Sequence, residues 1–232
     1  MGIRSNHNSK IAEERGRKGA GSMRVRPVSF DVLVEELADR LAEQGPDRRL
    51  RVAIDGAPAA APETLADALV DPLRVRGRPA IRIAAGDFLR PASVRLEEGR
   101  TNPDAFYSGW LDEAGLRREV LDPAGPGGSG RIVTRLWDAR ADRAAREPYT
   151  PVPPAAVLLI SGSLLLGAGL PFDVTVHLEL SAAALERRTD AQLRWTLPAY
   201  ARYRAEVDPS SFADVVVRLD DPRRPALVLD RS

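Results

Sequence analysis

The sequence predicts an α/β domain built on a parallel sheet. Short apolar runs alternate with stretches of helical periodicity along most of the chain, and this alternation is typical of parallel strands joined by crossover helices. The run at 156–160 is apolar at every position, as expected for a strand covered on both faces. The run at 172–180 alternates instead, with apolar residues at every second position. The 232 residues suit one such domain with a substantial core.

The expected elements follow in a regular order. Ser29 is placed to cap a first helix with apolar positions through Leu41, and Gly45-Pro46 ends it. A strand at 50–54 leads through an Ala/Pro-rich turn into a helix from about Pro62 to Arg76. The later expectations are strands at 80–84, 132–137, 156–160, 172–180 and 213–219, an edge strand at 226–229, and helices at 110–120 and 181–197 with a further helical piece ending near 209.

Composition excludes several functional classes. The chain has no cysteine, which removes disulfides, thiolate metal sites and cysteine nucleophiles. It has two histidines, one of them near the N-terminus, so no metal site is expected. No apolar stretch approaches the roughly 20 residues of a membrane span, and the basic N-terminus lacks the apolar centre of a signal peptide. We therefore expect a cytoplasmic protein without a membrane partner.

Residues 1–22 differ in composition from the rest of the chain. They are polar and basic, and they hold both lysines, Lys10 and Lys18. We expect 1–22 to be a disordered leader or tag-like tail and 23–232 to be the folded domain. The leader carries five positive and two negative charges, which leaves 29 positive and 31 negative charges, a net charge of −2, on the domain. A nucleic-acid partner is therefore not expected, because such proteins carry a basic surface.

The strand, turn and helix at 51–70 have the arrangement of a nucleotide-binding loop. That motif requires Gly-x-x-x-x-Gly-Lys-Ser/Thr, whose backbone amides, ammonium and hydroxyl hold phosphates and magnesium. Gly56 matches the first glycine, but Ala61, Pro62 and Glu63 stand at the second glycine, lysine and hydroxyl positions. Proline offers neither an ammonium nor an N–H, and Glu63 places a carboxylate where phosphate would bind. From this segment alone, an ordinary strand–turn–helix and a degenerate phosphate loop both remain open.

An ordered series of motifs extends over residues 50–222. The segment from Asp55 to Thr64 aligns without a gap on Asp-Gly-x-x-Gly-Ala-Gly-Lys-Thr-Thr. The others are Arg-Gly-Arg-Pro at 76–79, Gly-Asp-Phe-Leu-Arg-Pro at 86–91, Pro-Asp-Ala-Phe-Tyr at 103–107, Pro-Gly-Gly at 126–128, Trp-Asp at 137–138, Ile-Ser-Gly at 160–162, Ala-Asp-Val-Val-Val at 213–217 and Asp-Pro at 221–222. In this order they resemble the uridine kinase-like group of P-loop kinases, which includes nucleoside and pantothenate kinase-like proteins. The resemblance implies a three-layer P-loop NTPase fold with a parallel sheet and a helical lid region.

Departures from this family fall on its chemistry. The resemblance places the catalytic base at Gly86, with Asp87 beside it, and the acidic residue that helps to order magnesium at Ser161. Where the family's lid carries arginines, this chain retains Arg187, Arg188 and Arg194 nearby. Phosphoryl transfer depends on positioning and charge neutralisation, so these losses would remove most of the activity.

The acceptor side of the family's cleft is better preserved. The resemblance places the nucleoside pocket at Asp104, Phe106, Tyr107, Trp137 and Asp138. Aromatic faces beside carboxylates suit a hydroxylated ligand with a ring. We expect a pseudokinase that binds a small nucleoside-like or polyhydroxylated molecule, or a partner protein, without a cofactor. The alternatives are an active kinase that uses ATP and Mg with atypical residues, and a kinase fold recruited to other chemistry.

Two further features remain open at the level of sequence. His177 lies on the polar side of the alternating run, where it fits a solvent-facing or sheet-packed residue or a catalytic histidine. The basic and aromatic stretch at 200–204 fits either a remnant of the lid or a solvated helix face.

Overall fold

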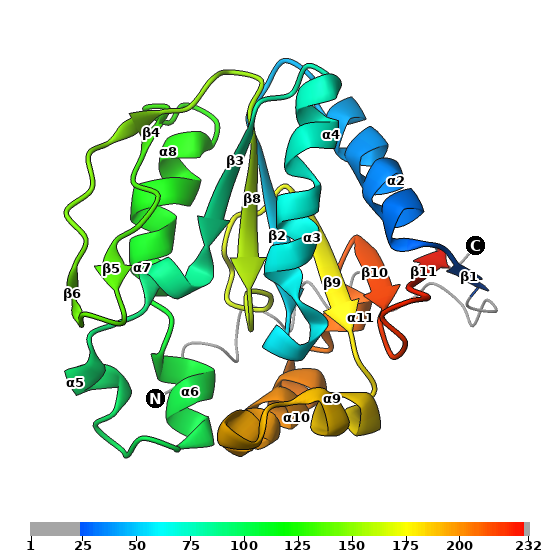
Figure 1. Cartoon of the computed structure of the whole chain (residues 1–232). Coiled ribbons are helices and arrows are strands. Elements are labelled where there is room, and N and C mark those ends of the chain that lie inside the picture. Colours follow the sequence, from blue (N-terminus) through cyan, green and yellow to red (C-terminus); the bar gives the residue numbers. More distant parts are fainter. Residues whose placement is uncertain (1–23, 230–232) are drawn as a thin grey trace.

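The computed structural model describes residues 24–229, so the predicted leader at 1–22 lies outside the described residues. A seven-stranded sheet forms the centre of the fold (Figure 1). The five strands from β10 to β3 run parallel, and β11 runs antiparallel to both of its neighbours. In spatial order the strands are β1 (Arg24–Pro27), β11 (Ala226–Leu229), β10 (Val215–Arg218), β9 (Val174–Glu179), β2 (Leu50–Gly56), β8 (Val157–Gly162) and β3 (Ala80–Ala84).

Helices cover both faces of the sheet, which makes three layers and confirms the predicted fold class. On one face, α2 (Phe30–Glu43), α3 (Pro62–Ala68) and α4 (Val70–Val75) pack against alternate strand residues such as Val52 and Ile54. On the other face, Ala53 and Ile160 pack under α7 (Glu113–Leu116), the π-turn η3 (Arg117–Leu121) and α8 (Asp122–Ala124). Every residue of β2 and β8 is buried, as expected for the two strands between these layers.

The remaining elements lie around this core. Two short ladders pair β4 (Arg131–Ile132) with β7 (Thr150–Pro151) and β5 (Trp137–Asp138) with β6 (Arg143–Ala144). The others are η1 (Pro58–Ala60), η2 (Ala85–Phe88), α5 (Ala92–Arg95), α6 (Pro103–Gly109), α9 (Ala182–Arg188), η4 (Ala191–Thr196), α10 (Leu197–Glu206) and α11 (Pro209–Phe212). Helices α6, α9 and α10 lie beyond the carboxyl ends of the central strands (Figure 1). Of these, α9 and α10 carry residues of the predicted lid region, and α6 carries predicted acceptor residues.

Several predicted boundaries differ from the structure. The helix expected from Pro62 to Arg76 divides at Leu69, since Pro72 lacks the N–H that a continuous helix would use. The helix expected to reach 197 ends at Arg188, where Thr189 bonds back to Leu185 O at 2.6 Å and a 3₁₀ turn follows. The strand expected at 132–137 is reduced to the short ladders. The predicted edge strand, β11, is covered by β1, whose exposed Arg-Val-Arg-Pro sequence gives no strand pattern.

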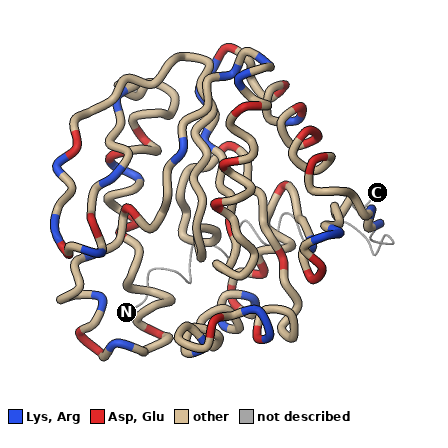
Figure 2. The backbone as a smooth tube through the Cα atoms, viewed as in Figure 1, with Lys and Arg blue, Asp and Glu red and all other residues tan. Residues whose placement is uncertain are grey.

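Charged residues of both signs are interspersed along residues 24–229 (Figure 2). This distribution follows the near balance of charges in the domain sequence. Among the described helices, none combines the length and apolar character that crossing a bilayer requires.

Candidate functional site

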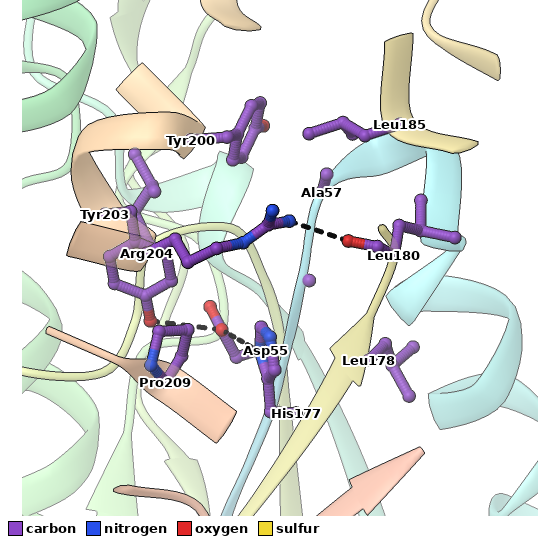
Figure 3. A pocket seen from close by; sticks show the side chains of 12 residues that line it. Asp55, Ala57, His177, Leu178, Leu180, Leu185, Tyr200, Tyr203, Arg204 and Pro209 are labelled. Carbon is purple, nitrogen blue, oxygen red and sulfur yellow. Dashed lines mark hydrogen bonds and ion pairs between the residues drawn. The ribbon is translucent and has the colours of Figure 1, made fainter. Parts of the chain in front are cut away.

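A buried polar cluster lies at the carboxyl ends of β2 and β9. Parallel pairing sets Asp55 of β2 directly beside His177 of β9, and His177 Nδ1 lies 2.7 Å from Asp55 Oδ2. Tyr203 of α10 donates its hydroxyl to the same oxygen at 3.1 Å (Figure 3). Leu165 N donates to Asp55 Oδ1 at 2.9 Å. Asp55 is fully buried and His177 is 8% exposed. The histidine is thus sheet-packed, and it is held by a carboxylate.

This cluster borders a partly open cavity of about 40 Å³. Most of its walls are apolar, and Gly56 and Ala57 bring the start of the predicted phosphate loop to its edge. Arg204 crosses it and donates to Leu180 O at 2.7 Å (Figure 3). The full lining is Asp55, Gly56, Ala57, Leu164, His177, Leu178, Leu180, Leu185, Tyr200, Tyr203, Arg204 and Pro209.

Two tyrosines of α10 are buried against the cluster. Burial raises the pKa of Tyr200 to about 12. A hydrogen bond from Tyr200 to Ser163 Oγ at 3.2 Å lowers this pKa, and the negative charge of Asp55 raises it further. Burial, and then the charge of Asp55, raises the pKa of Tyr203 well above its ordinary value. Both phenols therefore stay protonated at neutral pH and act as hydrogen-bond donors toward the strand ends.

The predicted phosphate loop is a tight turn that bonds to itself. Ala60 N donates to Ala57 O at 2.8 Å and Ala61 N donates to Pro58 O at 2.9 Å. Ala61 has the left-handed values φ 54° and ψ 55°, and Pro62 follows as the first, buried residue of α3. Thr64 N bonds back to Ala61 O at 3.1 Å. Pro58 and Pro62 have no amide hydrogen. The amides of Ala60, Ala61 and Thr64 are therefore used within the turn.

Gly56 has a packing role in this turn. A Cβ at this position would lie 3.0 Å from Leu178 Cβ and 3.3 Å from Leu178 O. The close approach of β2 to β9 thus favours glycine at this position independently of any phosphate. Glu63 and Thr64, in the first turn of α3, are exposed to solvent.

Gly86, the position predicted for a catalytic base, has free space around it. Gly86 is exposed in η2, and a Cβ there would meet no heavy atom within 4 Å. Neighbouring Asp87 turns to Arg135, whose Nε donates to Asp87 Oδ1 at 2.9 Å. Asp87 therefore forms an ion pair with Arg135, and it does not line the cavity beside Asp55.

An arginine occupies the surroundings of Ser161. Ser161 is fully buried in β8, and Arg82 of β3 donates to its Oγ at 3.0 Å. The same guanidinium bonds Asp67 Oδ1 at 2.6 Å and Glu63 O at 3.4 Å. An internal cation thus joins β8 to the first helix after the loop.

The predicted acceptor residues on α6 contact α10. Asp104 pairs with Arg202 at 3.1 Å, and Tyr107 OH donates to Glu206 Oε2 at 3.0 Å. Arg202 also lies 4.5 Å from the ring centroid of Tyr107. Phe106 stands at the centre of an aromatic cluster, at centroid distances of 5.3, 5.6 and 5.9 Å from Trp110, Trp195 and Tyr200.

Trp137 and Asp138 belong to the β5–β6 hairpin. Trp137 Nε1 donates to Asp142 Oδ1 at 3.1 Å, while Asp138 Oδ1 accepts from Arg140 N and Ala141 N, each at 3.0 Å. The Ala141 amide, and then that of Arg140, lowers the pKa of Asp138. Asp142 also lies 3.8 Å from Arg95, which stacks at 5.1 Å on Trp110. The predicted acceptor residues of α6 and those of the β5–β6 hairpin are therefore connected through Asp142, Arg95 and Trp110. Neither group lines the cavity beside Asp55.

The predicted lid arginines lie on or just after α9. Arg188 donates to Leu219 O at 2.6 Å and so anchors α9 to the end of β10, whereas Arg187 and Arg194 are exposed. Arg204 is the arginine that reaches the cavity. The basic and aromatic stretch at 200–204 carried the signal for it, but the sequence pattern did not separate buried from solvated positions.

Comparison with known proteins identifies the fold. Neither a protein-family model nor a curated protein matches the chain. Among solved structures, a possible uridine kinase from Bacillus stearothermophilus is similar, with 19% identity and a TM-score of 0.64, over 79% of this chain and 96% of the other. A candidate fructose transport system kinase from Silicibacter sp. TM1040 has 25% identity and a TM-score of 0.54, over 79% and 92%. The YGR205w protein has 11% identity and a TM-score of 0.57, over 88% and 100%. This chain has the uridine kinase-like P-loop fold.

Proposed function

We propose that this protein with a P-loop kinase fold is a pseudokinase, which binds a small nucleoside-like or polyhydroxylated molecule and transfers no phosphate from ATP. The observation that carries the proposal is the conformation of Ala61. Its left-handed backbone is the conformation that glycine adopts freely, and it stands where the phosphate-loop motif has its second glycine. A backbone conformation suited to glycine, held here by alanine, supports the interpretation of this turn as a degenerate phosphate loop.

The residues of this turn do not fit a magnesium nucleotide. Ala60 and Ala61 use their amides within the turn, and Pro62 offers neither an N–H nor a positive charge. Glu63 adds a negative charge beside the position of the phosphates. At the position of the acidic magnesium-ordering residue, Ser161 accepts from Arg82. We therefore derive no phosphoryl-transfer step for this site.

The acceptor side supports a role in binding. Phe106, Trp110 and Trp195 are partly exposed aromatic rings of α6, its C-terminal end and η4. Asp104 is exposed two residues before Phe106 on α6, where it pairs with Arg202. Rings stack on a planar ligand, while carboxylates accept its hydroxyl protons. These residue types favour a small hydroxylated ligand with a ring as the occupant.

Calorimetric titration with Mg-ATP tests the absence of nucleotide binding. We expect no measurable heat, and no turnover of uridine or cytidine with ATP. The triple variant Ala61→Gly, Pro62→Lys and Glu63→Thr restores the cradle, the ammonium and the hydroxyl. It should bind Mg-ATP while its turnover stays weak, because Gly86 cannot accept the proton of an acceptor hydroxyl.

Ala61→Gly alone is the matched control for the triple variant. It relieves the backbone without adding charge, and it should not bind nucleotide. Micromolar binding of Mg-ATP by the unmodified chain, or turnover of a nucleoside, would instead establish an active kinase with atypical residues. A folded triple variant that ignores ATP would show that the turn is not a degenerate phosphate loop.

A further inference from the structure

The buried Asp55–His177 pair is not explained by the kinase resemblance. Asp55 is fully buried and His177 is 8% exposed, yet both border the cavity at the end of β2. A buried carboxylate is stable only when several donors compensate for its lost hydration. The arrangement of those donors determines which nitrogen of the imidazole carries a hydrogen.

Asp55 accepts from every neighbour that reaches it. Leu165 N donates to Oδ1 at 2.9 Å, and the Tyr203 hydroxyl donates to Oδ2 at 3.1 Å. The same hydroxyl accepts from Leu166 N at 3.0 Å, so its single hydrogen is available for Asp55. A carboxylate bonded in this way is an acceptor toward His177 as well, at 2.7 Å. The ring hydrogen of a neutral His177 therefore lies on Nδ1, and Nε2 keeps its lone pair.

The lone pair on Nε2 is directed to the cavity. Among residues 24–229, the ring of His177 has one hydrogen-bond partner, Asp55, which contacts Nδ1. No fully buried side-chain nitrogen or oxygen in this range lacks a partner, so the unbonded Nε2 is not fully buried. Nε2 is therefore reached from the cavity that His177 lines. Of the other polar groups there, Tyr200 donates to Ser163 and Arg204 donates one N–H to Leu180 O. Both are donors, so Nε2 is the group that can accept a hydrogen bond from a ligand hydroxyl.

The size and walls of the cavity restrict what can occupy it. A volume of about 40 Å³ corresponds to roughly three water positions, which suits the end of a molecule and not a whole ring system. Leu164, Leu178 and Leu185 make the walls apolar, and the carboxylate of Asp55 offsets the positive charge of Arg204, so the lining carries no net positive charge that would attract an anion. We propose that this cavity is a hydroxyl-binding subsite, in which His177 Nε2 accepts a hydrogen bond from the terminal CH–OH group of a small alcohol-bearing ligand. The proposal does not depend on the loss of ATP binding.

Carbethoxylation by diethyl pyrocarbonate tests the state and access of Nε2. The reagent acylates an accessible imidazole nitrogen that has a lone pair. His7 and His177 are the two histidines of the chain, so the variant His7→Ala reports on His177 alone by peptide mass. We expect His177 to react in the folded protein. Asp55→Asn should slow the reaction roughly tenfold, because the amide can donate to Nδ1 and shift the ring hydrogen to Nε2.

A matched variant separates this effect from a general loss of stability. Tyr149→Phe also removes a hydrogen bond between a phenol and a carboxylate, that of Tyr149 with Glu119 at 2.7 Å, but on the surface. It should leave the reactivity of His177 unchanged. If Asp55→Asn does not fold, nitrogen NMR of the unmodified ring decides, since it distinguishes a hydrogen on Nδ1 from one on Nε2. Reaction of His177 only after unfolding, or a hydrogen on Nε2, would overturn the proposal.

Protection experiments identify the ligand chemistry. Glycerol should slow the carbethoxylation of His177, and sodium phosphate at equal concentration should not. Protection by phosphate but not by glycerol would make the cavity an anion site, which contradicts the proposal. An accessible Nε2 that neither compound protects would also contradict it. None of these outcomes depends on Mg-ATP binding, so this subsite and the pseudokinase proposal can fail separately.

Discussion

Replacing Ala61 with glycine should stabilise the protein, although it deletes a methyl group next to a buried turn. Ala61 has φ 54° and ψ 55°, a conformation that costs an L-residue with a Cβ about 1–2 kcal/mol. Glycine avoids this cost. It also makes the unfolded chain more flexible, which lowers the free energy of unfolding by about 0.4–1 kcal/mol. The net gain is about 0.5–1 kcal/mol. For a chain of this size, such a gain raises the melting temperature by about 1–4 °C.

The same substitution two residues earlier is the control. Ala59 lies in the 3₁₀ turn at an ordinary negative φ, so Ala59→Gly relieves no strain. It should lower stability by about 0.5–1 kcal/mol. Urea unfolding followed by circular dichroism measures both variants, and the two changes should have opposite signs. If Ala61→Gly is neutral or destabilising while Ala59→Gly behaves as expected, the left-handed turn is not strained, and the main support for a degenerate phosphate loop is lost.

Three other predictions follow from the site. Gly86→Asp should change the unfolding free energy by less than about 0.5 kcal/mol in urea, because a Cβ there meets nothing within 4 Å; a large loss would show that the position is not free for a base. Asp104→Ala should abolish stabilisation by nucleosides in thermal-shift assays but leave the unliganded melting temperature within about 2 °C, since its side chain is 74% exposed; unfolding, or stabilisation that survives the change, would remove Asp104 from the ligand site. Burial raises the pKa of Tyr200 to about 12, so the folded state retains this proton above pH 10 and loses up to about 2–3 kcal/mol of stability as the pH rises from 10 to 12; in Tyr200→Phe, unfolding measured across this range should show a shallower alkaline decline.

The periodicity of the sequence was sufficient to predict the layers of the fold. Runs such as 156–160 are buried on both sides in any α/β sheet. In β9 the alternation gave the apolar positions correctly, but Thr175 and His177 between them are buried as well. Short-range features were also predictable, including the Ser29 cap, whose Oγ accepts from Val32 N at 3.2 Å. Boundaries failed where a local bond competed with the helix, as at Thr189, because periodicity does not measure such competition.

The candidate site divides in the same way. The sequence by itself determined which groups of the phosphate-loop motif the turn at 56–64 lacks, because Ala61, Pro62 and Glu63 do not carry the required atoms in any conformation. Only the tertiary structure decided that Asp55 meets His177, 122 residues away, and Tyr203, 148 residues away. Their proximity depends on the register between two parallel strands and on where α10 crosses them. Such long-range placement is set by the packing of the whole core, which no local pattern encodes.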